Sequence, residues 1–232
     1  MSKFRSTQKM ELTNKTKETQ IENVSTATIH MKNILPEEMQ KFLFNLALDL
    51  GKKENGDFGF YIKKNDEFVL NMNTRGRIYR ELIDFPEYQT LKKLCNDLVK
   101  LAQEKSKKIP DMNITHLLLV YYSNDEGMSW HRDSDKNDGD NDHPIVSISL
   151  GSTCSFGLKP LLKEEKFVKL QSGDVLIWGG PERMLEHCVD KINIGTSPFE
   201  NLKGRLNFTF RSAPNIIGKE KDFETKNFWV DQ

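Results

Sequence analysis

The sequence predicts an α+β protein in which two helices precede a β-sandwich or barrel. Apolar residues recur at helical spacing in two stretches, residues 36–50 and 87–101. From residue 114 onward, short strand-like segments follow one another, with turn residues between them and no further helical pattern. Helices that come first and strands that come afterwards are typical of an α+β fold.

Boundary residues delimit both predicted helices. Pro36 suits the first helical position, Glu37 and Glu38 suit the first turn, and Gly51 follows the last apolar residue. The second helix follows Pro86. Each stretch carries an apolar stripe that should pack on the core: Met39, Phe42, Leu43, Leu46 and Leu50 in the first, and Leu91, Leu94, Cys95, Leu98 and Leu101 in the second.

The strand-like segments have lengths and alternation that fit a sheet with one buried face. Residues 117–122 form an apolar run, and residues 145–150 alternate between apolar and serine positions. Residues 166–170 and 175–178, with a Ser-Gly-Asp turn between them, predict a hairpin. Upstream, residues 56–83 indicate short strands, and the basic cluster around Tyr79 suits either a base-stacking, phosphate-holding surface or a solvated ribbon edge.

Composition narrows the class of protein. The 34 basic residues balance 34 acidic residues, so the net charge is zero. A nucleic acid would therefore have to bind to a local basic patch. Three scattered cysteines argue against a disulfide framework and for a reducing compartment. No apolar run is long enough to span a membrane, and the N-terminus does not have the pattern of a secretory signal. We therefore expect an intracellular protein, cytoplasmic or nuclear, with no membrane partner.

An HxD motif lies near the middle of the chain. In an extended segment His131, Asp133 and Asp135 share one face. An imidazole and a carboxylate are two of the three ligands of a facial 2-His-1-carboxylate iron site. His187, beyond the apolar segment 175–178, is the candidate third ligand. Short HxD patterns also recur in charged loops, and a lone histidine is more often a core residue, which is how we interpret His30, His116 and His143.

The last predicted strand, residues 205–211, is the most informative segment. Alternation places Leu206, Phe208 and Phe210 on one face, and the other face carries Arg205, Asn207, Thr209 and Arg211. Two arginines and an amide on one face suit an anion held by paired hydrogen bonds, such as a dicarboxylate. Taken alone, this strand also fits an amphipathic strand with its polar face in water. The joint occurrence of this strand with HxD and His187 favours a site.

Five segments together resemble the AlkB family of iron(II)- and 2-oxoglutarate-dependent dioxygenases: residues 131–133, 144–151, 173–180, His187 and 205–211. The resemblance implies a double-stranded β-helix (jelly-roll) core with N-terminal helices packed on one sheet and a β-ribbon nucleotide-recognition lid. It divides the chain into a flexible polar arm (1–23), helices and lid (24–112), catalytic core (113–213) and C-terminal tail (214–232).

The resemblance also implies the roles of individual residues. Iron(II) would be held by His131, Asp133 and His187, which are therefore the expected catalytic residues. 2-Oxoglutarate would be bound by Tyr122, Arg205, Asn207 and Arg211. Val120 stands where the family has an asparagine that contacts the cosubstrate.

Substrate contacts are implied for Arg77, Tyr79, Asp135 and Lys159. Arg77 stands where close relatives have an aromatic residue, and Pro160 stands where they have an arginine. Asp135 equally suits a loop acid that caps the following turn.

The implied activity is oxidative demethylation of N-alkylated bases of the 1-methyladenine and 3-methylcytosine type, with O2 consumed and succinate, CO2 and formaldehyde released. The substrate would be DNA, or also RNA, with the target base single-stranded or flipped out, and a monomer is expected. One alternative is a dioxygenase of the same fold that acts on a protein or a small molecule. A non-catalytic nucleic-acid-binding module is a second alternative.

Overall fold

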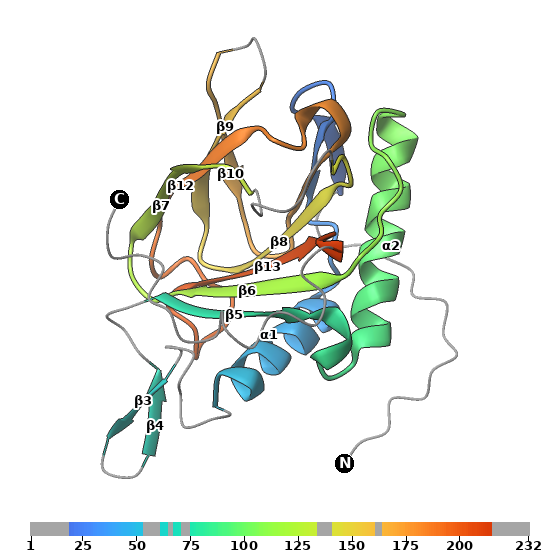
Figure 1. Cartoon of the computed structure of the whole chain (residues 1–232). Coiled ribbons are helices and arrows are strands. Elements are labelled where there is room, and N and C mark those ends of the chain that lie inside the picture. Colours follow the sequence, from blue (N-terminus) through green and yellow to red (C-terminus); the bar gives the residue numbers. More distant parts are fainter. Residues whose placement is uncertain are drawn as a thin grey trace.

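The computed structural model describes residues 19–52, 61–64, 67–70, 75–133, 141–160 and 164–214. Two antiparallel sheets face each other across an apolar interior, and two helices cover the outer face of the larger sheet (Figure 1). The predicted α+β fold with a jelly-roll core and N-terminal helices on one sheet is therefore confirmed. Neither described helix is long and apolar enough to cross a membrane.

The larger sheet has seven strands in the order β1-β2-β11-β8-β13-β6-β5. Their bounds are Gln20–Asn23 (β1), Thr28–Lys32 (β2), Val175–Trp178 (β11), Ile145–Gly151 (β8), Arg205–Arg211 (β13), His116–Tyr122 (β6) and Arg75–Glu81 (β5). β13 pairs with both β6 and β8, so its side chains lie in the middle of the sheet. This position explains why every residue of β13 is buried.

The smaller sheet has the order β10-β9-β12-β7. Its strands are Lys166–Leu170 (β10), Cys154–Lys159 (β9), Glu186–Ile192 (β12) and Glu126–His131 (β7). β3 (Tyr61–Lys64) and β4 (Glu67–Leu70) form a separate two-stranded sheet.

Both predicted helices are confirmed. α1 covers Glu37–Lys52 and α2 covers Tyr88–Lys105. The apolar stripes pack on the outer face of the larger sheet, against β-strand residues such as Leu117, Ile148 and Phe208. Short 3-10 helices, η2 (Leu82–Asp84) and η3 (Gly180–Glu182), lie before α2 and between β11 and β12.

Two local expectations differ from the structure, the hairpin and the polar arm. The predicted hairpin of residues 166–178 is wrong, because β10 and β11 belong to different sheets and the turn between them crosses from one sheet to the other. The predicted polar arm ends in a strand, since β1 pairs with β2. The segment resembling a nucleotide-recognition lid forms the edge strand β5, which pairs with β6. Residues 1–18 and 215–232 of the predicted arm and tail lie outside the described residues.

Contacts within the turn and with the β2 segment of the larger sheet hold the crossing turn. Asp174 accepts hydrogen bonds from the backbone N–H groups of Asn33 (2.8 Å) and Gln171 (2.9 Å), and it contacts His30 Nε2 at 3.1 Å. Gly173 has φ +87°, and a Cβ there would lie 2.4 Å from Gln40 Nε2. Gln40 itself donates to the Leu35 carbonyl at 2.9 Å, so it cannot move away without losing a buried hydrogen bond.

We predict that Gly173→Ala destabilises the protein more than Gly195→Ala does. Gly195 also has a positive φ, +84°, but no atom lies within 4 Å of its would-be Cβ. Gly195→Ala should therefore cost only the left-handed backbone conformation, about 1–2 kcal/mol. Gly173→Ala should cost about 1 kcal/mol more because Gln40 loses a hydrogen bond. Urea denaturation measures both values, and equal costs would contradict the packing at Gly173.

Candidate metal and cosubstrate site

Three predicted ligands meet between the two sheets. His131 is the last residue of β7, and His187 is its cross-strand partner on β12. Asp133 lies two residues beyond the end of β7, and its Oδ1 is 3.7 Å from His131 Nε2 and 3.8 Å from His187 Nε2. One ligand atom from each residue lies within 4.8 Å of the others, so the group could hold a metal ion. No second group of this kind occurs in the described part of the chain.

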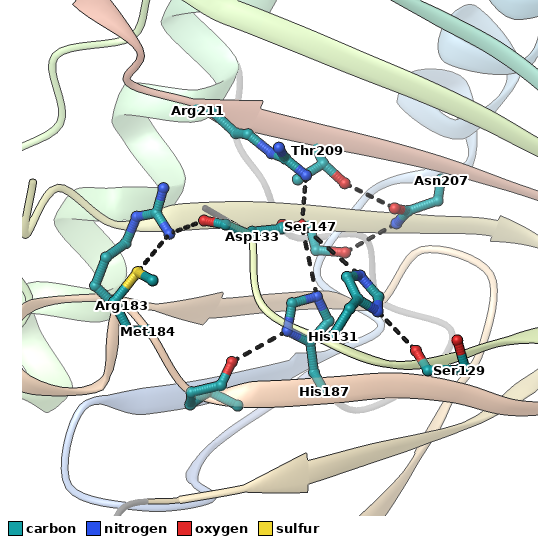
Figure 2. A network of polar contacts seen from close by, with 11 residues as sticks. Ser129, His131, Asp133, Ser147, Arg183, Met184, His187, Asn207, Thr209 and Arg211 are labelled. Carbon is teal, nitrogen blue, oxygen red and sulfur yellow. Dashed lines mark hydrogen bonds and ion pairs between the residues drawn. The ribbon is translucent and has the colours of Figure 1, made fainter. Parts of the chain in front are cut away.

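The orientation of both imidazoles suits metal binding. His131 Nδ1 lies 2.8 Å from the Ser129 carbonyl oxygen, and His187 Nδ1 lies 3.3 Å from the Leu185 carbonyl oxygen. A carbonyl only accepts hydrogen bonds, so each Nδ1 carries a proton, and Nε2 is the ring nitrogen that remains to face a metal. Figure 2 shows both rings directed toward Asp133. The donor set of two imidazole nitrogens and one carboxylate fits iron(II).

Asp133 is buried and remains ionised. Burial by itself raises the pKa of a carboxyl group, but the surrounding side chains, first Arg211 and then His187, His131 and Arg183, outweigh burial and lower the pKa of Asp133 to about 2. Arg211 Nη2 lies 2.5 Å from Asp133 Oδ1. The carboxylate is therefore available as a negatively charged ligand at neutral pH.

His187 lies in an apolar enclosure. Its ring is 5.0 Å from that of Trp178 and stacks on that of Phe156 at 5.6 Å. Burial lowers the pKa of His187 to about 4, against the opposing influence of the Asp133 carboxylate. His187 is therefore neutral at physiological pH, and a metal would not have to displace a proton from it.

An arginine with unused donors faces the same interior. Arg205 is 1% exposed. Its Nη2 donates to Ser149 Oγ at 3.0 Å, while its Nε and Nη1 have no hydrogen-bond partner. Its guanidinium lies 5.4 Å from the Tyr122 ring. A buried arginine with two nitrogens that lack a hydrogen-bond partner is suited to bind a carboxylate, so the residues present fit one end of 2-oxoglutarate.

Asn207 lies on the same face as Arg205, but the protein itself uses its amide. Its Nδ2 donates to Ser147 Oγ (2.8 Å) and to the Ile148 carbonyl (2.9 Å), and its Oδ1 accepts from Thr209 Oγ1 at 2.8 Å. Val120 is its cross-strand neighbour on β6. These serine and threonine partners were not singled out from the sequence as site residues, although the alternation of residues 145–150 placed Ser147 and Ser149 on one face.

The predicted substrate residues are dispersed. Tyr79 is half-buried, and its ring lies 5.8 Å from the Arg211 guanidinium and 5.6 Å from that of the exposed Arg77. Lys159 instead lies over the Trp130 ring, at 4.1 Å, and pairs with Glu165 at 3.0 Å. Alternation along β9 directs Lys159 away from the interior that Leu158 faces. Asp135 lies outside the described residues.

The remaining histidines have local partners, as expected. His30 contacts Asp174, His116 Nδ1 lies 2.7 Å from Thr115 Oγ1, and His143 Nδ1 lies 2.7 Å from the Asp111 carbonyl. None of them belongs to the metal group.

A sequence profile described as the 2OG-Fe(II) oxygenase superfamily matches residues 28–211, most of the chain. The chain belongs to the 2OG-Fe(II) oxygenase superfamily. This membership confirms the predicted iron(II), 2-oxoglutarate and O2 as the reactants of its family.

Curated relatives of this oxygenase confirm the resemblance to AlkB. The DNA N(6)-methyladenine demethylase ALKBH1D of Arabidopsis thaliana is 28% identical over 212 residues, which cover 78% of this chain and 48% of that protein. The dioxygenase AlkB of Escherichia coli K12 is 34% identical over 106 residues, covering 45% of this chain and 48% of that protein. The chain thus spans about half the length of the curated relatives it matches.

Solved structures agree on the fold of this oxygenase. The structure of OsALKBH1 superposes with a TM-score of 0.68 at 21% identity, covering 84% of this chain and 100% of that chain. A 2OG-Fe(II) family oxidoreductase from Burkholderia pseudomallei superposes with a TM-score of 0.53 at 14% identity, covering 79% and 84%.

The low pKa of His187 predicts a stability loss on mild acidification of the metal-free protein. An unfolded histidine takes up a proton near pH 6.5, whereas folded His187 does so only near pH 4. Between these values the unfolded state binds more protons, so stability falls as pH falls. We expect His187→Asn to remove up to roughly 3 kcal/mol of this pH dependence. Denaturation curves from pH 7 to pH 4 measure it, and identical slopes in both proteins would rule out burial of His187 as the cause.

Proposed function

We propose that this chain is an iron(II)- and 2-oxoglutarate-dependent oxidative demethylase of N-methylated nucleic-acid bases. The observation that carries the proposal is that two groups face the same interior: the His131, Asp133 and His187 cluster, and Arg205 with two nitrogens that lack a hydrogen-bond partner. One group suits the metal and the other suits the cosubstrate. The AlkB and ALKBH1D relatives support a methylated base as the substrate.

Each residue has a physical task in this proposal. His131 and His187 offer their Nε2 atoms, and Asp133 offers a carboxylate kept ionised by Arg211. Arg205 pairs with the distal carboxylate of 2-oxoglutarate, and Tyr122 contacts the cosubstrate. Bound iron(II) would couple oxidation of 2-oxoglutarate by O2 to hydroxylation of the N-methyl carbon, which then leaves as formaldehyde. Succinate and CO2 account for the remaining atoms.

The exposure of the three proposed ligands indicates how a substrate would reach the site. His131 is the most exposed of the three ligands, at 27%, whereas Asp133 and His187 are buried, so the substrate would approach from the His131 side.

Tyr79, with Arg77 and Arg211 beside it, offers an aromatic ring against which a base can stack. Asp135 would favour cationic bases such as 1-methyladenine and 3-methylcytosine. A stacked base in a duplex cannot reach such an interior, so a single-stranded or flipped-out nucleotide is required. Action as a monomer in the cytoplasm or nucleus stays a prediction.

The direct test is demethylation of single-stranded DNA and RNA oligonucleotides that carry 1-methyladenine, 3-methylcytosine or N6-methyladenine. We expect formaldehyde and succinate in equal amounts with the first two bases, dependent on iron(II). Asp133→Ala should lower turnover by at least 100-fold, because removal of a ligand removes the metal. Arg132→Ala, at the exposed neighbouring residue, is the control. Turnover of 2-oxoglutarate without demethylation of any oligonucleotide would indicate a protein or small-molecule substrate instead.

A second prediction separates the cosubstrate from the metal. Arg205→Met keeps the volume of a buried side chain but removes the N–H donors, so we expect the Kd for 2-oxoglutarate to rise at least 30-fold, the loss of about 2 kcal/mol for a charged hydrogen-bonded pair. The affinity for the metal should stay within threefold. Calorimetric titration with a redox-inert divalent metal measures both constants. Unchanged cosubstrate affinity would remove Arg205 from the proposed site.

A further inference from the structure

The turn between β11 and β12 carries two consecutive charged residues that are both buried. Glu182 is 5% exposed and Arg183 is 3% exposed. Ionised side chains are seldom buried without a specific partner, because removal from water is costly. The partners of these two residues lie in opposite directions, and together they link the metal site to the larger sheet.

Arg183 contacts the main chain of Asp133 rather than its carboxylate. Its Nη1 donates to the Asp133 carbonyl oxygen at 2.5 Å (Figure 2). The carboxylate of the same residue is held by Arg211 Nη2, also at 2.5 Å. Asp133 is therefore fixed at two points, its main chain by one buried arginine and its side chain by another.

Glu182 anchors the turn to the larger sheet. Its Oε2 accepts hydrogen bonds from Ser25 Oγ (2.6 Å), from the Ala27 backbone N–H (2.8 Å) and from Thr28 Oγ1 (2.8 Å). Three donors on one buried carboxylate oxygen leave the turn little freedom, since breaking them would leave an unpaired buried charge. The main chain of the neighbouring Arg183 is thereby fixed relative to β2.

The same turn also orients His187. The Leu185 carbonyl accepts from His187 Nδ1, and the Leu185 backbone N–H donates to the Glu182 carbonyl at 3.1 Å. His131 has a different support, because it lies in the β7–β12 ladder opposite His187. Asp133 follows the end of β7, so no strand pairing sets its position. The contact from Arg183 replaces that missing support.

We propose that Arg183 is a positioning residue, which fixes the main chain of Asp133 so that its carboxylate meets the two histidines around the metal. The inference rests on the iron site of the proposed function. Arg183 binds neither cosubstrate nor substrate in this role. Removal of a residue that orients a metal ligand, without binding the metal itself, typically lowers metal affinity by 10–100-fold.

Metal affinity is the quantity that tests this role, without cosubstrate or substrate present. Cobalt(II) is titrated against a competing chelator into the wild type and into Arg183→Met, which keeps most of the side-chain volume but has no donor. We expect cobalt(II) to bind 10–100-fold more weakly, with a changed ligand-field absorption spectrum. A merely structural effect would lower thermal stability without changing the spectrum of the bound cobalt(II).

The chain offers a matched control in Arg132→Ala. Arg132 is directly bonded to Asp133 and carries the same charge, but its side chain is 56% exposed and pairs with Glu186 at 3.2 Å. Its removal should change cobalt(II) affinity by less than threefold. An equal loss in both variants would assign the effect to charge and overturn the positioning role.

A second variant covers the case in which Arg183→Met does not fold. Arg183→Gln is polar, and its amide nitrogen is two bonds closer to the backbone, so it cannot reach the Asp133 carbonyl from the same position. Wild-type cobalt(II) affinity in a folded Met or Gln variant would overturn the inference. Failure of the wild type itself to bind cobalt(II) would instead refute the proposed iron site.

Discussion

The Asp133 carboxylate is the group on which the site depends. It is buried, and a buried carboxylate alone would become protonated and cease to be a ligand. Arg211 prevents this by direct contact, and its own strand, β13, is buried along its whole length between β6 and β8. One inner strand of the larger sheet, β13, therefore supplies both the cation that keeps the proposed metal ligand ionised and the cation that is proposed to bind the cosubstrate.

Burial favours the neutral form of both side chains, and this has opposite consequences for metal binding by His187 and by Asp133. It keeps His187 neutral, which a metal requires, and it would neutralise Asp133, which a metal does not tolerate. The protein resolves this conflict by enclosing His187 with aromatic rings and by giving Asp133 an arginine. The same apolar interior thus prepares both ligands.

Much of this arrangement could be predicted from the sequence, because it depends on local patterns. Pro36 directly precedes α1, whereas Gly51, the predicted end, lies within its last turn. The alternation of residues 205–211 gives the correct face for Arg205 and Arg211. The hairpin at residues 166–178 was wrong because a Ser-Gly-Asp turn looks the same whether the chain returns along one sheet or crosses to another. β1 was missed because an edge strand with mostly exposed residues has no apolar pattern.

Arg183 could not be predicted from the sequence for a different reason. Its partner lies 50 residues away, and nothing in the segment around it distinguishes a buried arginine from a solvated one. Two of the three proposed ligands, Asp133 and His187, are contacted by the one turn at residues 180–185, and the third pairs with β12. We therefore expect a working site to need a fixed number of residues between Arg183 and His187. Related chains should accept insertions and deletions freely in many other loops, but a single-residue change of length here would displace two ligands in different directions.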